Sequence, residues 1–179
     1  VREGKPFLHS HMAAVLPAYQ NAGIGRRLKL QQRADALARG IRRVEWTFDP
    51  LELRNAYFNL ERLGAIARHY LPNLYGRTTS PLHAQLPTDR LLAEWWLDSP
   101  RVEACVAGRP VARPTAAERI QVPAQIGEWR HRSPRSAERA QLVVRAQLEH
   151  WFGKGYAAVG FEVHAASGDG TYLLAPYEC

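Results

Sequence analysis

The stretch Val15-Leu16-Pro17-Ala18-Tyr19-Gln20-Asn21-Ala22-Gly23-Ile24-Gly25-Arg26-Arg27 decides the fold, because it joins the end of a strand to the start of a helix. Pro17 has no backbone N–H, so regular strand pairing should fail near residue 16. Gly23 and Gly25 lack a Cβ and let the backbone approach a ligand closely. A helix N-terminus carries unpaired N–H groups and a partial positive charge, so a phosphate-binding loop is expected here. Positive charge is added by Arg26, Arg27 and Lys29.

The segments on either side of this stretch predict alternating strands and helices. Alternation of side chains predicts a largely buried strand over residues 6–15. Helical spacing of apolar residues predicts a helix over 23–39 that ends at Gly40. Residues 43–48 alternate as a strand, and the sequence 49–52 is typical of a helix start, with that helix ending at Gly64. This order implies a parallel strand pair joined by a right-handed crossover.

The rest of the chain divides into a linker and a smaller unit. Further strands are expected over 65–75 and 90–97. Residues 98–118 contain three prolines among small and charged residues and predict a linker. Beyond it we expect a strand at 119–122, a helix over 133–152 and two strands at 156–163 and 171–174. The predicted organisation is a core over 1–97, a linker over 98–118 and a small αβ subdomain over 119–179.

Composition excludes several classes of protein. The chain of 179 residues suits one domain with room for an appended unit, and no run of about 18 apolar residues predicts a membrane span. The net charge of +7 comes almost wholly from scattered arginines without a basic and aromatic stripe, which does not favour a nucleic-acid binder. The two cysteines lack metal-ligand spacing and indicate reduced thiols in a cytoplasmic protein, and we expect no metal site.

The loop pattern Gln20-x-x-Gly23-x-Gly25 resembles the pyrophosphate loop of the GNAT superfamily of acyl-CoA N-acyltransferases. The resemblance covers about residues 5–97, and the string 46–60 is similar to an uncharacterised bacterial branch of that superfamily. It implies an α/β (α+β) fold, with a mixed sheet flanked by helices. The strands and helices that normally precede residue 6 in the family have no counterpart here. Either residues 119–175 partly replace them or, as we favour, the chain is truncated, and its exposed apolar edge can then associate into a homodimer.

The resemblance also implies a cofactor site for acetyl-CoA or another acyl-CoA. The pyrophosphate would lie on the loop, and the pantetheine arm would pair with the end of the strand 6–15 like an added strand. Asn55 would hydrogen-bond the cofactor. The residues implied in cofactor binding are Ala13, Ala14, Val15, Gln20, Asn21, Ala22, Gly23, Ile24, Gly25, Arg26 and Asn55.

Catalysis would transfer the acyl group to a small-molecule amine by direct attack. His9 and His11 share the strand face that should meet the thioester, and imidazole titrates near neutral pH, so both are candidate bases. The family often has a Tyr at the position of Leu60, and Tyr57 and Tyr70 are the nearby alternatives for the acid. An inactive acyl-CoA-binding or partner-assembly module with the same fold is the competing hypothesis.

Overall fold

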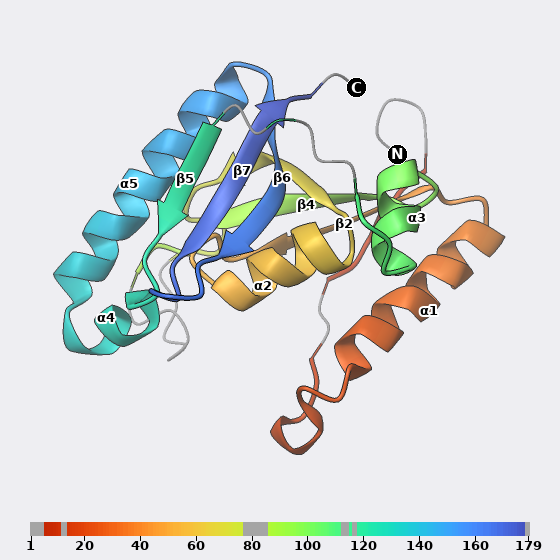
Figure 1. Cartoon of the computed structure of the whole chain (residues 1–179), viewed down its shortest axis with the longest axis horizontal. Helices are drawn as coiled ribbons and strands as arrows, with labels where there is room; N and C mark the ends of the chain where they lie inside the picture. The colour runs from red at the N-terminus through yellow and green to blue at the C-terminus, as the bar shows by residue number, and fades with distance from the viewer. Residues whose placement is uncertain (1–5, 12–13, 77–85, 112–114, 116–117, 178–179) are drawn as a thin grey trace.

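The computed structural model describes residues 6–11, 14–76, 86–111, 115 and 118–177. Within them, the strands form one sheet of seven strands in the order β1-β2-β4-β3-β6-β7-β5. The elements in chain order are β1 (Leu8–His9), η1 (Pro17–Tyr19), α1 (Ile24–Ala38), β2 (Arg43–Phe48), α2 (Leu53–Tyr57), η2 (Phe58–Arg62), β3 (Ile66–Leu71), β4 (Arg90–Trp96), α3 (Pro100–Val106), β5 (Glu118–Val122), α4 (Ile126–Arg132), α5 (Pro134–Gly153), β6 (Tyr156–Val163) and β7 (Gly170–Pro176). The chain therefore has a mixed α/β architecture, in which α5 runs alongside β5 and α2 lies across the sheet (Figure 1).

The strand–helix–strand unit predicted from the loop is confirmed. Strands β1 and β2 are parallel, with Leu8 opposite Val44, and α1 connects them. Gly40 ends α1 with a φ of 72°, in the left-handed region that suits a residue without a Cβ. All other strand pairs are antiparallel, so the sheet is mixed.

The prediction of a strand over residues 6–15 was too long. Strand β1 has two residues, and the backbone N–H of Ser10 makes its last ladder bond, to the carbonyl of Glu45 at 2.7 Å. Residues 14–16 are outside any strand, and Pro17 opens a turn of 3-10 helix instead. Proline has no backbone N–H to donate to a neighbouring strand, and it favours the first turn of a helix. The strand pairing therefore ends before residue 17.

The helix predicted to begin at Asp49 begins at Leu53 instead. The Oδ1 atom of Asp49 accepts from the N–H of Leu51 and stabilises a turn, while its Oδ2 atom accepts from Arg130 at 2.7 Å. Asp49 is therefore part of the preceding turn, and the N-cap of α2 is Glu52. The predicted end is confirmed, since Gly64 follows η2 with a φ of 74°.

The residues predicted as a linker contain a packed helix. Helix α3 begins after Ser99, whose Oγ atom accepts from the N–H of Val102. Val102 and Cys105 are buried, and a Cβ added at Gly64 would lie 3.1 Å from the Cα atom of Val102 and 3.0 Å from the Sγ atom of Cys105. The prediction counted Pro100 among the prolines that indicate a linker, but proline is favoured in the first helical turn, and here Ser99 caps that turn.

The C-terminal strands extend the same sheet rather than forming a separate one. Strand β6 joins β3 through the single pair Ala67 and Ala158, and β7 and β5 follow on its far side. Helix α5 packs against β3, β5 and β6. The boundary between the two predicted units therefore runs through a continuous sheet. Helix α4, which was not predicted, precedes α5.

The two faces of β2 differ in chemistry. Val44, Trp46 and Phe48 belong to the main apolar core, which includes residues of α1, α2 and α5. Alternation directs Glu45 and Thr47 to the opposite face, where a cavity lies. We call the first side the helix face and the second the cavity face.

Candidate functional site

The loop before α1 has the features of an anion site. Gly23 is the N-cap of the 15-residue helix, with a φ of 73° and nothing within 4 Å of the position a Cβ would take. The first helical bond runs from the N–H of Arg27 to the carbonyl of Gly23, at 3.1 Å. The N–H groups of residues 23–26 precede that bond and have no acceptor within the helix. No acidic side chain lies in the first turn, so the partial positive charge of the helix end is not neutralised there.

Three side chains hold this loop in shape. Gln20 donates from Nε2 to the carbonyl of Val15 at 3.1 Å, which closes the turn. Arg54 at the start of α2 donates to the Oδ1 atom of Asn21 at 2.9 Å. Arg26 donates to the carbonyl of Val106 at 2.6 Å, at the end of α3. The guanidinium of Arg26 therefore supports the helix, and its contribution to an anion site is through its backbone N–H.

Among the described residues, the edge of β2 beyond β1 has no strand paired with it. The carbonyl of Glu45 points toward β1, where it accepts from Ser10. Backbone groups alternate along a strand, so the N–H and C=O of Thr47 point to the same edge, beyond the last ladder bond of β1. The other edge of β2 stays paired with β4 through Phe48. The edge at Thr47 can therefore accept an extended, amide-bearing ligand as an added strand.

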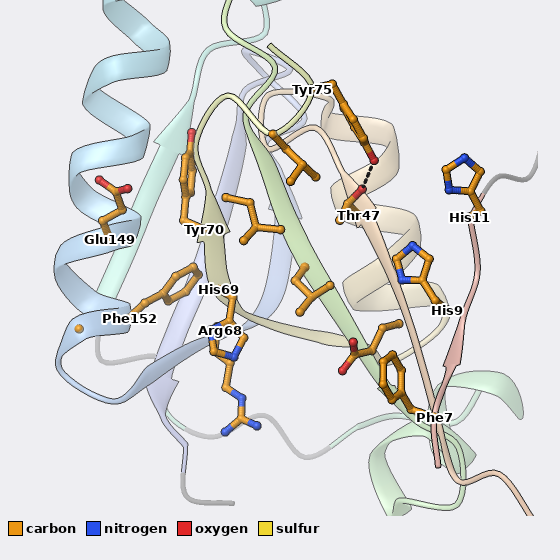
Figure 2. Close-up of a pocket in the computed structure, with 15 residues that line it drawn as sticks. Phe7, His9, His11, Thr47, Arg68, His69, Tyr70, Tyr75, Glu149 and Phe152 are labelled. Carbon is orange, nitrogen blue, oxygen red and sulfur yellow. Dashed lines mark hydrogen bonds between the residues drawn. The ribbon is translucent and has the colours of Figure 1, made fainter. Parts of the chain in front are cut away.

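A cavity of about 950 Å³ opens on the cavity face of the sheet, as Figure 2 shows. Its floor follows cross-strand neighbours, because His9 lies opposite Glu45 and Thr47 lies opposite Leu92, which in turn lies opposite His69. Helix α5 supplies a wall with Phe152. The cavity thus reaches from the open edge at β1 to the C-terminal helix.

Charged residues form part of this floor, since Glu45 and Arg68 line the cavity. The carboxylate of Glu94 is fully buried and contacts Arg43 at 3.0 Å and Arg68 at 2.9 Å. Arg43 also contacts the buried carboxylate of Glu45 at 2.6 Å, and its guanidinium lies 4.6 Å from the ring centre of Trp96. Each carboxylate has an arginine partner, which offsets the cost of removing it from water. This network gives the floor a fixed electrostatic arrangement.

A second polar group closes the far end of the cavity. Tyr70 donates to the buried carboxylate of Asp89 at 2.6 Å, and Arg145 of α5 donates to both carboxylate oxygens at 2.7 Å. Burial and the neighbouring Asp89 raise the pKa of Tyr70 well above its ordinary value. The hydroxyl therefore keeps its proton and donates it to Asp89 in a hydrogen bond. Together with Arg145, this bond links β3, the start of β4 and α5.

Lys29 lies on the helix face, beneath the point where β1 and β2 separate. Its side chain is buried, and Nζ donates to the Oγ atom of Ser10 at 3.1 Å and to the Oε1 atom of Gln32 at 3.2 Å. The Nζ atom also lies 3.8 Å from the ring centre of Trp46. Burial lowers the pKa of this ammonium to about 8, because the charged form loses its hydration.

Of the residues predicted for catalysis, the structure brings two together. His9 and His11 line the cavity, and their ring centres are 6.3 Å apart. Tyr57 is on α2, is 41% exposed and does not line that cavity, and Asn55 is exposed on the same helix.

The predicted cofactor residues lie before or within the loop. Ala14 is exposed, Val15 is half-buried, and Ala13 lies outside the described residues. Residues 20–23 are exposed, and residues 24–26 are half-buried at the helix start. The structure keeps this loop accessible, as a phosphate site requires.

Sequence reasoning did not assign a role to Lys29, Glu45 or Glu94. The signal for the carboxylates was present, since strand alternation in 43–48 places Glu45 opposite the apolar face. The sequence suggests Lys29 only as positive charge beside the loop. Its contact with Ser10 depends on how α1 returns across β2, which local pattern does not specify.

Comparisons with protein-family models, curated proteins and solved structures find no match to this chain. Among the described residues, no group of three or more His, Cys, Asp or Glu side chains is arranged to hold a metal ion. The helices described here include none with the length and apolarity needed to cross a membrane.

Proposed function

We propose that this chain binds acyl-CoA and transfers its acyl group to an amine, in the manner of a GNAT-like N-acyltransferase. The observation that carries the proposal is the set of N–H groups of residues 23–26, which precede the first helical hydrogen bond and lie in an accessible loop. A diphosphate is the anion that such a site favours, because it accepts several N–H donors at once. The strand–helix–strand unit around the loop supports the resemblance stated from the sequence.

The open edge at Thr47 supports a place for the rest of the cofactor. A pantetheine arm carries amide groups that can pair with the N–H and C=O of Thr47. The arm would pass from the loop to the gap between β1 and β2, and the acyl group would then meet the cavity. The acceptor amine would occupy that cavity, whose walls include Phe7, Tyr75 and Phe152.

His9 and His11 are the proposed bases. An amine attacks a thioester only after it has lost a proton, and neutral imidazole accepts a proton near neutral pH. Both rings lie on the cavity face next to the open edge, so they can reach an amine held in the cavity. The reaction forms a C–N bond and breaks the C–S bond, and the departing thiolate gains a proton.

The test is calorimetry with coenzyme A and acetyl-CoA on the wild-type chain and two variants. Gly23→Glu places a carboxylate among the loop N–H groups and should abolish binding. Gly40→Glu is the matched control, because Gly40 has the same positive φ and open surroundings at the other end of α1. Absence of binding to the wild-type chain, or equal loss in both variants, would refute the proposal.

The second candidate function is a module that binds acyl-CoA without catalysis, and the positions of the predicted acids support it. Tyr57 lies away from the cavity, and Tyr70 is committed to Asp89. Release of free thiol from acetyl-CoA with a panel of amines separates the two functions. Thiol release that depends on the amine supports the enzyme, whereas tight binding of coenzyme A without release supports the module.

A further inference from the structure

Lys29 lies against the gap between β1 and β2 from the helix face. Its Nζ atom is held by Ser10, the residue that makes the last ladder bond before β1 leaves β2. The same helix carries the loop N–H groups at its start, so a ligand that runs from the loop to the gap passes Lys29. The two histidines, by contrast, lie on the cavity face of the same strand pair.

No carboxylate compensates this ammonium. Among the described residues, its partners are Ser10, Gln32 and the ring of Trp46, all of them neutral. A lysine is seldom buried unless it is paired with an anion, so the position calls for a partner that the described part of the chain does not supply. The thiolate of coenzyme A is such a partner.

The other charged groups around Lys29 are engaged elsewhere. On α1, Arg26 donates to the carbonyl of Val106 and Arg33 donates to the carbonyl of Leu97. On β2, Glu45 lies on the cavity face and is paired with Arg43. On η2, Glu61 accepts from the backbone N–H of Phe161 at 2.7 Å. Lys29 Nζ, which contacts Ser10 at the end of the β1 ladder, is therefore placed to face a charge that develops at the gap on the helix face.

We infer that Lys29 is the general acid of the proposed acyl transfer and gives its proton to the sulfur of coenzyme A as the thiol leaves. The inference rests on the proposed function. In the step, the C–S bond breaks, its electron pair stays on sulfur, and a proton moves from the Lys29 ammonium to that sulfur. The acceptor amine meanwhile loses its proton to His9 or His11, so base and acid act from opposite faces of the strand pair. The resulting neutral amine of Lys29 regains a proton from water before the next turnover.

The lowered pKa of Lys29, about 8, fits this role. A thiol has an ordinary pKa of about 8.5, so donor and acceptor are closely matched and proton transfer costs little free energy. An unperturbed lysine, with a pKa near 10.4, would be a much weaker acid. The contacts with Ser10 and Gln32 orient Nζ toward the gap.

The first experiment compares pH profiles of amine acylation. The acid must be protonated, so the wild-type rate should fall as pH rises through about 8. Lys29→Arg keeps a proton at all accessible pH and should remove this alkaline fall, while Lys29→Met should lower kcat by about a hundredfold. The loss should shrink with an acetyl donor whose thiol is more acidic, such as phenyl thioacetate, because that thiol needs less protonation. Lys154→Met is the matched control, since Nζ of Lys154 lies 4.7 Å from the ring centre of Trp151, far along the chain from the gap.

The second experiment needs no turnover. The ultraviolet absorbance of the thiolate gives the pKa of coenzyme A bound to each variant. The ammonium of Lys29 should lower that pKa in the wild type relative to Lys29→Met by about one unit or more. Equal values in both proteins, with coenzyme A bound to each, would overturn the inference while leaving the proposed function intact. Failure of coenzyme A to bind the wild type would overturn both.

Discussion

Replacement of Lys29 by methionine should stabilise the folded chain at pH 7, although it removes two hydrogen bonds. Burial lowers the pKa of this ammonium from 10.5 to about 8. A difference of about 2.5 pKa units corresponds to about 3 kcal/mol of unfavourable free energy for the charged form in the folded state. Water near Nζ screens part of this cost, so about 1–2 kcal/mol is expected. Met has nearly the same length and needs no hydration, and Ser10 and Gln32 already hydrogen-bond one another at 3.2 Å.

The pH dependence gives the sharper measurement. Below pH 8 lysine is charged in both folded and unfolded chains, and its full cost applies. Between about pH 8 and 10.5 the unfolded chain binds the extra proton, so the free energy of unfolding of the wild type rises with pH. The advantage of Lys29→Met measured by urea denaturation at pH 7 should therefore shrink by about 1–2 kcal/mol at pH 10.5. Lys154→Met should show no such change. An equal difference at both pH values, or a variant less stable than wild type at pH 7, would refute the account of a desolvated ammonium.

Two further substitutions, each with a matched control, test the packing at Gly64 and the buried ion pair at Asp89. Gly64→Ala should destabilise the chain by about 2 kcal/mol or more, because a Cβ there would lie 3.0 Å from the Sγ atom of Cys105 in a left-handed conformation. Gly40→Ala, with a similar φ but open surroundings, should cost about 1 kcal/mol in the same thermal unfolding assay, and equal losses would contradict the steric argument. Asp89→Asn should cost about 3 kcal/mol in urea denaturation, because it leaves the guanidinium of Arg145 without its anion. Asp98→Asn, in an exposed ion pair, should change stability by less than about 1 kcal/mol, and a comparable effect of both would show that burial does not govern the pair at Asp89.

Local pattern predicted most of the helices and strands. The amphipathic spacing of residues 24–38, the alternation of 43–48 and the long apolar stripe of α5 each specify their own conformation. Glycines at 40 and 64 mark the ends that the structure confirms, because both adopt a positive φ. Helical spacing, strand alternation and helix-ending glycines depend on residues close in the sequence, so they can be predicted from the sequence alone.

The predictions that were wrong concern segments whose conformation depends on tertiary contacts. Strand β1 is short because Pro17 opens a turn of 3-10 helix and the chain leaves the edge at Ser10. The expected linker became α3 because Val102 packs beneath Gly64. The pairing of Ala67 with Ala158 joins segments far apart in the chain, and no local pattern could specify it.

The site stays a prediction, and the contacts around it could not be predicted from the sequence. The loop of glycines was visible because its residue types have local physical reasons. The pairing of Glu94 with Arg43 and Arg68, and the contact of Lys29 with Ser10, depend on strand register and on the path of α1 across β2. The proposed bases and the proposed acid, Lys29, lie on opposite faces of the sheet, which local pattern did not predict.

The most direct measurement is the backbone amide spectrum of the isotope-labelled chain during titration with coenzyme A. The N–H signals of Gly23, Ile24, Gly25 and Arg26 should shift the most, because the diphosphate would accept hydrogen bonds from them. Pantetheine, which lacks the diphosphate, should leave these signals in place while it shifts that of Thr47. Signals of residues 23–26 that stay unchanged as coenzyme A saturates the chain would contradict the account.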